Sequence, residues 1–300
     1  MAIEREVWLG HIVDNLFSDN SPITKSIDLT AFVQGKTCHI PNAGLLPGVV
    51  RNRSEFPGTV KKRTDTVSSF SLISFTTDPM LIPDNEKVQL SYDKRESVLR
   101  ASKMQLQEAI TDAILKQWLA EKGADISTTG AATPAHTPSA TGNRKKLTRQ
   151  DIRAAMTQMN KDNIPSSDRY LLLDAEMYDQ LMEDLSETDK RMFDASANAQ
   201  SGVLGNLFGF SVMMRAKVGV SATGGEQKDL SASGEATDLA TALAWHEGSV
   251  CRANGEPQAF VSENDPQYYG DIMSFEALAA GAKYRADKKG IIRIIQATAD

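Results

Sequence analysis

The segment of residues 36–84 constrains the fold most, because it has the pattern of extended chain but cannot form a core of its own. It has no helical period, and the phrases NAGLLPG and EFPGT place turns in it. The stretch TVKKRTDTVSSFSLISF alternates Phe70 and Leu72 with serines, as a strand does. From Gly35 to Gly58, a strand rise of ~3.3 Å per residue gives a reach on the order of 70 Å. An isolated ribbon is marginal in water, so it must lie on its own domain or on another molecule.

Residues from about 86 to 122 predict one long helix. Helix formers fill the stretch DKRESVLRASKMQLQEAITDAILKQWLAEKG, which has no proline and no glycine before its last residue, Gly123. A single helix from Asp93 to Lys122 would be ~45 Å long, which suits the backbone of an elongated subunit. Its buried face is predicted from the spacing of Leu99, Leu106, Ile110, Ile114 and Trp118.

Three segments are expected to lie outside the packed body. Residues 1–35 are typical of an arm, with a weakly amphipathic start and the polar phrase SDNSPITKS. Residues 123–142 are rich in Gly, Ala, Thr and Pro, with Ile126 as the only large aliphatic residue, so we expect a mobile surface loop. Residues 219–238 have a similar composition and are also expected to be flexible.

Helix and strand patterns alternate from about residue 146 onward. Thr148 with Asp151 indicates a helix start, RYLLLD a core strand, and Asp174 the cap of a second helix. The phrase FGFSVMM predicts a strand, LATALAWHEGSV a helix, and the tail a pair of strands joined by a turn at 287–290. The helix that starts near Thr148 is predicted to have an inner face of Ile152, Ala155, Met156 and Met159. The helix capped by Asp174 is predicted to have an inner face of Tyr178, Leu181, Met182 and Leu185.

Composition limits the function classes. A net charge of −6 argues against a dedicated nucleic-acid binder, whose phosphate contacts need a basic surplus. No stretch approaches ~18 consecutive apolar residues, so no membrane span is predicted. The first residues lack the pattern of a secretory signal, and Cys38 and Cys251 have no CxxC partner. We therefore expect free thiols and a cytoplasmic site of synthesis.

The sequence predicts no catalytic residue, no metal ligand and no cofactor. The histidines at 11, 39, 136 and 246 have no second ligand at metal-binding spacing. Cys38 and His39 are adjacent on a predicted strand, so their side chains point to opposite faces and cannot act together. His246 is expected on a helix face. The glycine-rich phrase SGVLGNLFGF matches no phosphate-binding loop, and basic runs such as Lys288-Lys289 lack aromatic residues for stacking on bases.

The order of these parts resembles the major capsid proteins of tailed bacteriophages, which share the HK97-like coat fold. The phrase IPSSDRYLLLDAEMYDQLMEDL is similar to a strand-then-helix segment of that family, and GVLGNLFGFSVMM to its turn and strand. VQLSYDKRESVL and the tail from DPQYYGDIM onward are also similar to such coats. The resemblance covers nearly the whole chain.

The resemblance implies an α+β, HK97-like coat fold with five parts. An N-terminal arm would occupy residues 1–35, an extended β-hairpin called the E-loop 36–84, and the spine helix of the peripheral (P) domain with its flexible loop 85–145. A compact axial (A) domain would occupy 146–255, and returning P-domain strands 256–300. The implied function is structural and not enzymatic: copies assemble through hexamers and pentamers into an icosahedral shell around the DNA genome of a tailed phage.

The expected partners are further copies of the chain, together with separate scaffolding and portal proteins. Packaged DNA would be contacted only indirectly, and no membrane is involved. The protein would be assembled in the bacterial host cytoplasm and remain in the virion. We expect the terminal hairpin to join the P-domain sheet through Ile291, Ile292, Ile294 and Ile295, with its charges meeting acidic neighbours. The residues expected at the assembly interface are Lys61, Lys62, Arg63, Arg95, Lys283, Arg285 and Lys288.

Three alternatives stay open from the sequence. An encapsulin-like nanocompartment resembles the same fold but encloses enzyme cargo. A phage tail or adaptor component would form tubes or single rings. A hydrolase would use Cys38 or His39.

Overall fold

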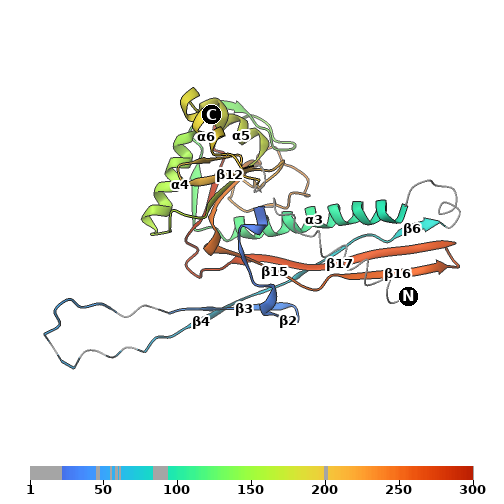
Figure 1. Cartoon of the computed structure of the whole chain (residues 1–300). Coiled ribbons are helices and arrows are strands. Elements are labelled where there is room, and N and C mark those ends of the chain that lie inside the picture. Colours follow the sequence, from blue (N-terminus) through green and yellow to red (C-terminus); the bar gives the residue numbers. More distant parts are fainter. Residues whose placement is uncertain are drawn as a thin grey trace.

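The described part of the chain is an α+β molecule with a compact lobe, a long body and a thin ribbon (Figure 1). The computed structural model describes residues 22–44, 48–54, 56–57, 60, 62–83, 94–198 and 202–299, with the side chains of the first helix described from residue 102 onward. The helices in these ranges are α3 (Lys94–Ala120), α4 (Arg149–Lys161), α5 (Ala175–Asp184) and α6 (Glu187–Ala195), with 3-10 turns at Pro22–Thr24, Thr30–Phe32 and Glu247–Ser249.

Helix α3 runs along the long body and confirms the predicted rod (Figure 1). Its 27 residues make it ~40 Å long. The predicted start near residue 86 and the side chain of Leu99 lie outside what the structure describes. The rest of the predicted buried face is confirmed, with at most 4% exposure at Leu106, Ile110, Ile114 and Trp118.

A six-stranded sheet lies against α3 and forms the rest of the body. Its strands are β1 (Ile27–Asp28), β15 (Val250–Asn254), β17 (Gly270–Lys283) and β16 (Gln258–Asp265), with β5 (Ile73–Thr76) and β6 (Met80–Pro83) also paired to β17. Gly281 lets the helix approach the sheet, because a Cβ there would lie 2.6 Å from Cγ2 of Ile114. The Gly281 N–H also donates to Oε1 of Gln117 at 2.6 Å.

A seven-stranded sheet forms the centre of the lobe. Its order is β11 (Gly205–Leu207), β12 (Phe210–Met214), β10 (Arg169–Leu173), β14 (Leu239–His246), β18 (Ile291–Ile295) and β7 (Ala124–Ser127), with β13 (Val220–Ser221) paired to β14. All residues of β10 are buried. Leu172 joins the core on the α3 side, whereas Leu171 and Leu173 join the core beneath α4 and α5. The sheet is therefore packed on both faces, as the run RYLLLD predicted.

The predicted helix starts of the lobe are confirmed. The backbone N–H of Thr148 donates to Oδ2 of Asp151 at 2.9 Å, which completes a capping box on α4. Asp174 caps α5 by accepting the Met177 N–H at 2.7 Å. All the residues predicted on the inner faces of α4 and α5 join the lobe core. Met156, Tyr178 and Met182 are partly buried. The buried residues are Ile152, Ala155, Met159, Leu181 and Leu185. The predicted strand in FGFSVMM is confirmed as β12, in which Phe210 and Val212 are buried and Met214 is 47% exposed.

The prediction of a mobile loop at 123–142 is wrong. This segment contains β7 and part of a three-stranded sheet whose members are β8 (Ala132–Pro134), β9 (Asn143–Lys145) and β19 (Thr298–Ala299). Arg144, only 4% exposed, donates to the carbonyl oxygens of Ala236 and Asp238 at 3.2 and 3.1 Å. The segment is ordered by backbone pairing and by this buried guanidinium, and not by large aliphatic side chains of its own.

Two further predictions are corrected by the sheet topology. Residues 239–246 form strand β14 and not a helix, which places His246 at a strand end. Strand β14 is central in its sheet and buried on both sides, so residues 239–246 are apolar on both faces. A sequence of this kind lacks the alternation of apolar and polar residues by which a strand is recognised. The last two long strands do not form a hairpin: β17 belongs to the body sheet, and β18 pairs with β14 and β7 in the lobe. The isoleucines of β18 therefore join the lobe sheet.

The ribbon projects far from the body (Figure 1). It consists of β3 (Thr37–Asn42) paired antiparallel with β4 (Thr66–Ser71), and β2 (Val33–Gln34) adds a short third strand at its base. The predicted limit at residue 84 is wrong, because residues 73–83 contain β5 and β6 of the body sheet. Of the predicted arm, residues 1–21 lie outside the described part. Residues 23–28 are held on the body by Arg252, which donates to the carbonyl oxygens of Ile23, Thr24 and Ser26.

Candidate assembly surfaces

The ribbon exposes large apolar side chains along its length. Val49 is 97% exposed, Val60 94%, Phe56 79% and Val67 65%. Beyond β3 and β4, the described residues at the tip belong to no helix or strand. Because extended chain with exposed apolar residues is not stable alone, this surface is suited to contact with another molecule.

The basic residues predicted on the ribbon are placed only in part. Arg63 forms an ion pair with Asp65, with the guanidinium Nε 2.5 Å from Oδ1. That carboxylate also accepts the Gly44 N–H at 2.8 Å, and the Arg63 hydrogen bond is the main reason that the pKa of Asp65 lies below its usual value. Lys62 forms no ion pair with a described residue, and Lys61 lies outside the described ranges.

The second predicted basic group lies at the end of α3. Lys283 and Lys288 both approach Oε2 of Glu121, at 2.7 and 3.1 Å. Burial would raise the pKa of Glu121, but the hydrogen bonds from these two lysines outweigh it and lower the pKa below the usual value. Arg285 pairs with Asp287 at 2.8 Å. These charges therefore meet acidic groups of their own chain.

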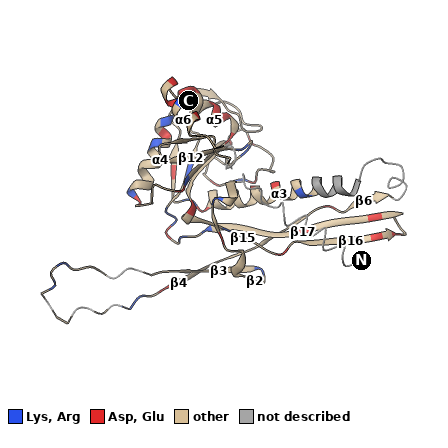
Figure 2. Ribbon diagram, in the orientation of Figure 1, with Lys and Arg blue, Asp and Glu red and all other residues tan. Residues whose placement is uncertain are grey.

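The structure brings only part of the predicted interface together. Lys283 and Lys288 share one carboxylate, whereas Lys62 and Arg63 lie on the ribbon (Figure 2). The side chain of Arg95 is outside the described part. An interface role for these residues stays a prediction.

Sequence reasoning missed an exposed tip on the body. The turn between β16 and β17 presents Tyr268 and Tyr269, which are 54% and 80% exposed. Phe260, on β16, is 48% exposed. The phrase DPQYYG contained the signal, namely two aromatic residues inside a polar turn.

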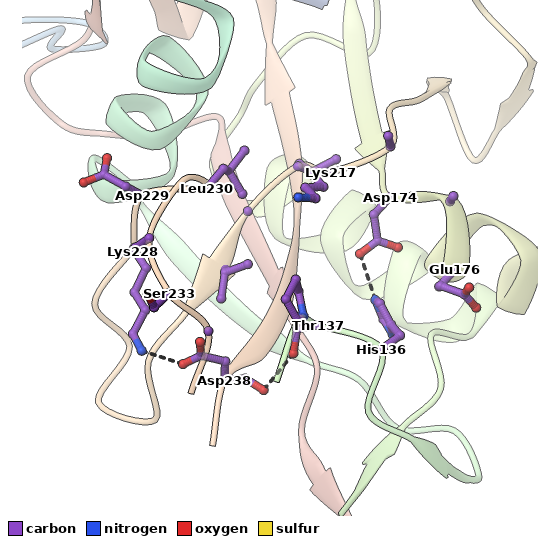
Figure 3. A pocket seen from close by; sticks show the side chains of 18 residues that line it. His136, Thr137, Asp174, Glu176, Lys217, Lys228, Asp229, Leu230, Ser233 and Asp238 are labelled. Atoms are coloured by element: carbon purple, nitrogen blue, oxygen red, sulfur yellow. Dashed lines mark hydrogen bonds and ion pairs between the residues drawn. The ribbon is translucent and has the colours of Figure 1, made fainter. Parts of the chain in front are cut away.

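A pocket of about 230 Å³ in the lobe is a candidate for a chemical site (Figure 3). His136 Nε2 lies 3.0 Å from Oδ2 of Asp174, whose other oxygen accepts the Met177 N–H. His136 Nδ1 is buried and has no described hydrogen-bond partner, so no hydroxyl is placed for this imidazole to deprotonate. Lys228 pairs with Asp238 at 2.7 Å across the pocket. The polar groups thus tie the pocket walls together and do not converge on one reacting atom.

The cysteines offer no nucleophile either. Both are free and buried, and burial raises the pKa of Cys38 and raises that of Cys251 to about 12. The exposed side of β3 carries His39, opposite Cys38, as predicted. Among the described residues no cluster of His, Cys, Asp or Glu could hold a metal ion, and no helix is long and apolar enough to cross a membrane.

Comparison with known proteins places the chain in a family. The family model described as phage capsid protein matches residues 90–294. The chain belongs to this family. A comparison with curated proteins finds no match.

Solved structures show the same fold in other capsids. The capsid of cyanophage P-SCSP1u has a TM-score of 0.64 at 16% identity over 94% of this chain and 90% of the other. The capsid of Ralstonia phage GP4 has a TM-score of 0.65 at 13% identity over 92% and 88%. A virus-like particle from Pyrococcus furiosus has a TM-score of 0.56 at 9% identity over 97% and 99%. These likenesses concern the fold.

The capsid protein therefore has the predicted α+β coat fold of the HK97-like kind and a structural, shell-forming function. It is not an enzyme, and its place is the virion capsid. This excludes the hydrolase alternative. In a capsid protein, the ribbon and the aromatic tip are surfaces available for contacts between copies.

Proposed function

We propose that this capsid protein assembles through hexamers and pentamers into an icosahedral shell that encloses the DNA genome of a tailed phage. Assembly takes place in the bacterial host cytoplasm with separate scaffolding and portal proteins, and the shell contacts packaged DNA only indirectly. The net charge of −6 supports the last point, because a shell that bound DNA tightly along its inner surface would need a basic surplus there.

The projecting ribbon is the single observation that carries this proposal. Its exposed Val49, Phe56 and Val60 lie away from the body, so a subunit by itself leaves them in water. Closed rings need heterologous contacts, in which a projection of one subunit docks on a different surface of the next. Stable shell interfaces of this kind bury about 2,000–5,000 Å². A long ribbon supplies much of that area without enlarging the core.

The division into domains is part of the proposal. We assign α3 and the six-stranded sheet to the P domain, and the seven-stranded sheet with α4, α5 and α6 to the A domain. The arm ends near residue 35. The E-loop comprises residues 36–71, since β5 and β6 pair with β17. Strand β18 belongs with the A domain, although it follows the long P-domain strand in sequence.

Deletion of residues 50–66, the tip of the ribbon, tests the proposal. The variant is expected to fold with an unchanged circular-dichroism spectrum but to form no closed particles in electron microscopy, where the parent protein forms shells. Phe56→Ser with Val60→Ser keeps the ribbon length and should also reduce shell yield. Met192→Ser is the matched control, because Met192 is 70% exposed on α6, away from the ribbon. Normal shells from the deletion would overturn the role of the ribbon, and tubes or single rings from the parent would indicate a tail or adaptor component.

A nanocompartment is the second candidate, because the fold is also that of the virus-like particle from Pyrococcus furiosus. Such a particle would enclose protein cargo in place of a genome. Particles purified from infected or induced host cells should contain DNA if the phage proposal is right. Particles that contain a defined enzyme and no DNA would favour the nanocompartment.

A further inference from the structure

Helices α4 and α5 carry opposite charges on their exposed sides. The only acidic residue of α4, Asp151, is 2% exposed and serves its capping box, whereas its basic residues Arg149, Arg153 and Lys161 are exposed. Helix α5 has no basic residue, and its acidic residues Glu176, Asp179, Glu183 and Asp184 are all exposed.

Part of this charge is neutralised within the chain. Lys146 pairs with Glu183 at 2.6 Å, and Arg149 pairs with Asp189 at 3.1 Å. The Arg149 N–H also donates to Asp184 at 2.8 Å. These contacts join the start of α4 to the end of α5 and to α6. Four charged side chains, two on each helix, form neither an ion pair nor a side-chain hydrogen bond with any described residue: Arg153, Lys161, Glu176 and Asp179.

The two unpaired cations line an open groove at the edge of the lobe sheet. β7 is the edge strand, paired to β18 on one side only among the described strands. Between it and α4 lies a groove of about 670 Å³, lined by Ala124, Asp125 and Ile126 of β7 and by Arg153, Thr157 and Lys161 of α4. The Asp125 carboxylate is paired with Arg293 at 2.9 Å, so Arg153 and Lys161 remain the unpaired charges of the groove. They suit a helix face or extended segment with acidic side chains.

The two unpaired anions lie on a different side of the same lobe. α5 begins where β10 ends, and Glu176 lines the pocket of Figure 3. Glu176 and Asp179 are three residues apart, so they share one face of the helix. In Figure 2, α4 lies along the left side of the lobe, whereas α5 lies beside α6 at its top.

We infer that the basic groove between α4 and β7 of one copy accepts the acidic face of α5 from the next copy around a ring. Two complementary surfaces on different sides of one subunit are what a heterologous, ring-forming contact requires. Opposite charge also fixes the register and disfavours like-with-like docking of two α4 or two α5 faces. The inference rests on the proposed shell function, and it specifies which surfaces of two neighbouring lobes meet within one ring of subunits.

Charge reversal in both directions tests the inference. Arg153→Glu with Lys161→Glu, and separately Glu176→Lys with Asp179→Lys, should each raise the protein concentration needed for half-maximal assembly at low salt by about tenfold or more. The chain with all four substitutions recovers complementarity between copies and should assemble within about threefold of the parent. Light scattering and sedimentation velocity measure assembly, and raised salt should weaken assembly of the parent.

Matched controls separate this contact from net charge and from folding. Lys145→Glu with Arg191→Glu makes the same change of charge at exposed residues away from the ribbon and from both proposed surfaces, and should assemble like the parent. Because Glu176 lies in the first turn of α5, a lysine there can weaken the helix; Glu176→Gln with Asp179→Asn avoids this and should still reduce assembly. Unchanged assembly of the folded α4 variants, or failure of the fourfold variant to recover, would overturn the inference. Failure of the parent to form shells would instead count against the proposed function.

Discussion

Trp118 of α3 packs against Trp245 of β14, with ring centroids 5.9 Å apart and ring planes at 42°. Both indoles are fully buried. Trp118 donates to the Cys251 carbonyl at 3.0 Å, and Trp245 donates to the Lys25 carbonyl at 2.7 Å. The pair thus joins α3, the lobe sheet, strand β15 of the body and the segment around Lys25 at one point.

Truncation of this pair should destabilise the subunit strongly. Trp118→Ala is expected to lower the free energy of unfolding by about 3–5 kcal/mol, because a large buried ring is lost and a cavity remains. Trp118→Phe keeps much of the apolar contact but leaves the Cys251 carbonyl without its donor, which should cost about 1–3 kcal/mol. Urea unfolding of the unassembled subunit measures both, with the exposed Met192→Ala as control. An unchanged midpoint for Trp118→Ala would contradict this role.

Arg144 should control the order of the segment 219–238. Its guanidinium, 4% exposed, holds the carbonyl oxygens of Ala236 and Asp238. Arg144→Met keeps the apolar stem but removes these bonds, at a cost of about 2 kcal/mol. Limited proteolysis within the segment should then be about thirtyfold faster, since cleavage tracks the open population. Lys145→Met, at an exposed neighbour, should leave the rate unchanged, and equal rates for the two variants would disprove the role of Arg144.

This arginine shows why part of the fold could not be predicted from the sequence. The period of α3, the caps Thr148 and Asp174 and the ribbon followed from local pattern, and the structure confirms them. Composition does not predict the order of segment 123–142, because that order comes from residues distant in sequence. The pattern of residues 239–246 does not predict strand β14, because burial on both faces removes the strand period.

The candidate surfaces also depend on contacts between residues that are far apart in the sequence. In the basic phrase GAKYRADKK, Lys283 and Lys288 pair with Glu121, more than 160 residues away in the sequence. No local pattern could show this pairing. The unpaired charges of α4 and α5 stand out only after the structure shows which neighbouring charges are already neutralised.

Acid should weaken the contact between α3 and the end of β17. The pKa of Glu121 in the folded chain lies below the ordinary value of 4.5, so its carboxylate stabilises the fold above that pH. This contribution should decline as pH falls from about 4.5 through the folded pKa. Glu121→Gln should cost about 1 kcal/mol at pH 7, a modest value because the group is partly exposed, and much less at pH 3. Glu263→Gln, at an exposed residue that forms no ion pair with a described residue, is the control in urea unfolding across this range. A Glu121→Gln cost that is equal at pH 7 and pH 3 would show that the ion pairs are not responsible.

The buried thiols should report on the base of the ribbon. Cys38 of β3 and Cys251 of β15 belong to one apolar cluster, together with Leu29, Leu72 and Ala280. Burial raises the pKa of Cys251 from 9.0 to about 12, which lowers its thiolate fraction at pH 8 by about a thousandfold. Both cysteines should therefore react very slowly with a thiol reagent in the native subunit and rapidly in denaturant.

Residual labelling in the native state would then require local opening where the ribbon meets the body. Leu72→Ala removes a side chain that is 7% exposed at this junction, so it should speed labelling of Cys38 by at least about tenfold. Val67→Ala, at a residue 65% exposed further along the same ribbon, should have little effect. Cys251→Ala and Cys38→Ala variants assign the signal to each thiol. Fast labelling of Cys38 in the unmodified native subunit would mean that the ribbon base is not packed on β15 and β17, and the ribbon would then have no fixed direction from which to reach a second copy.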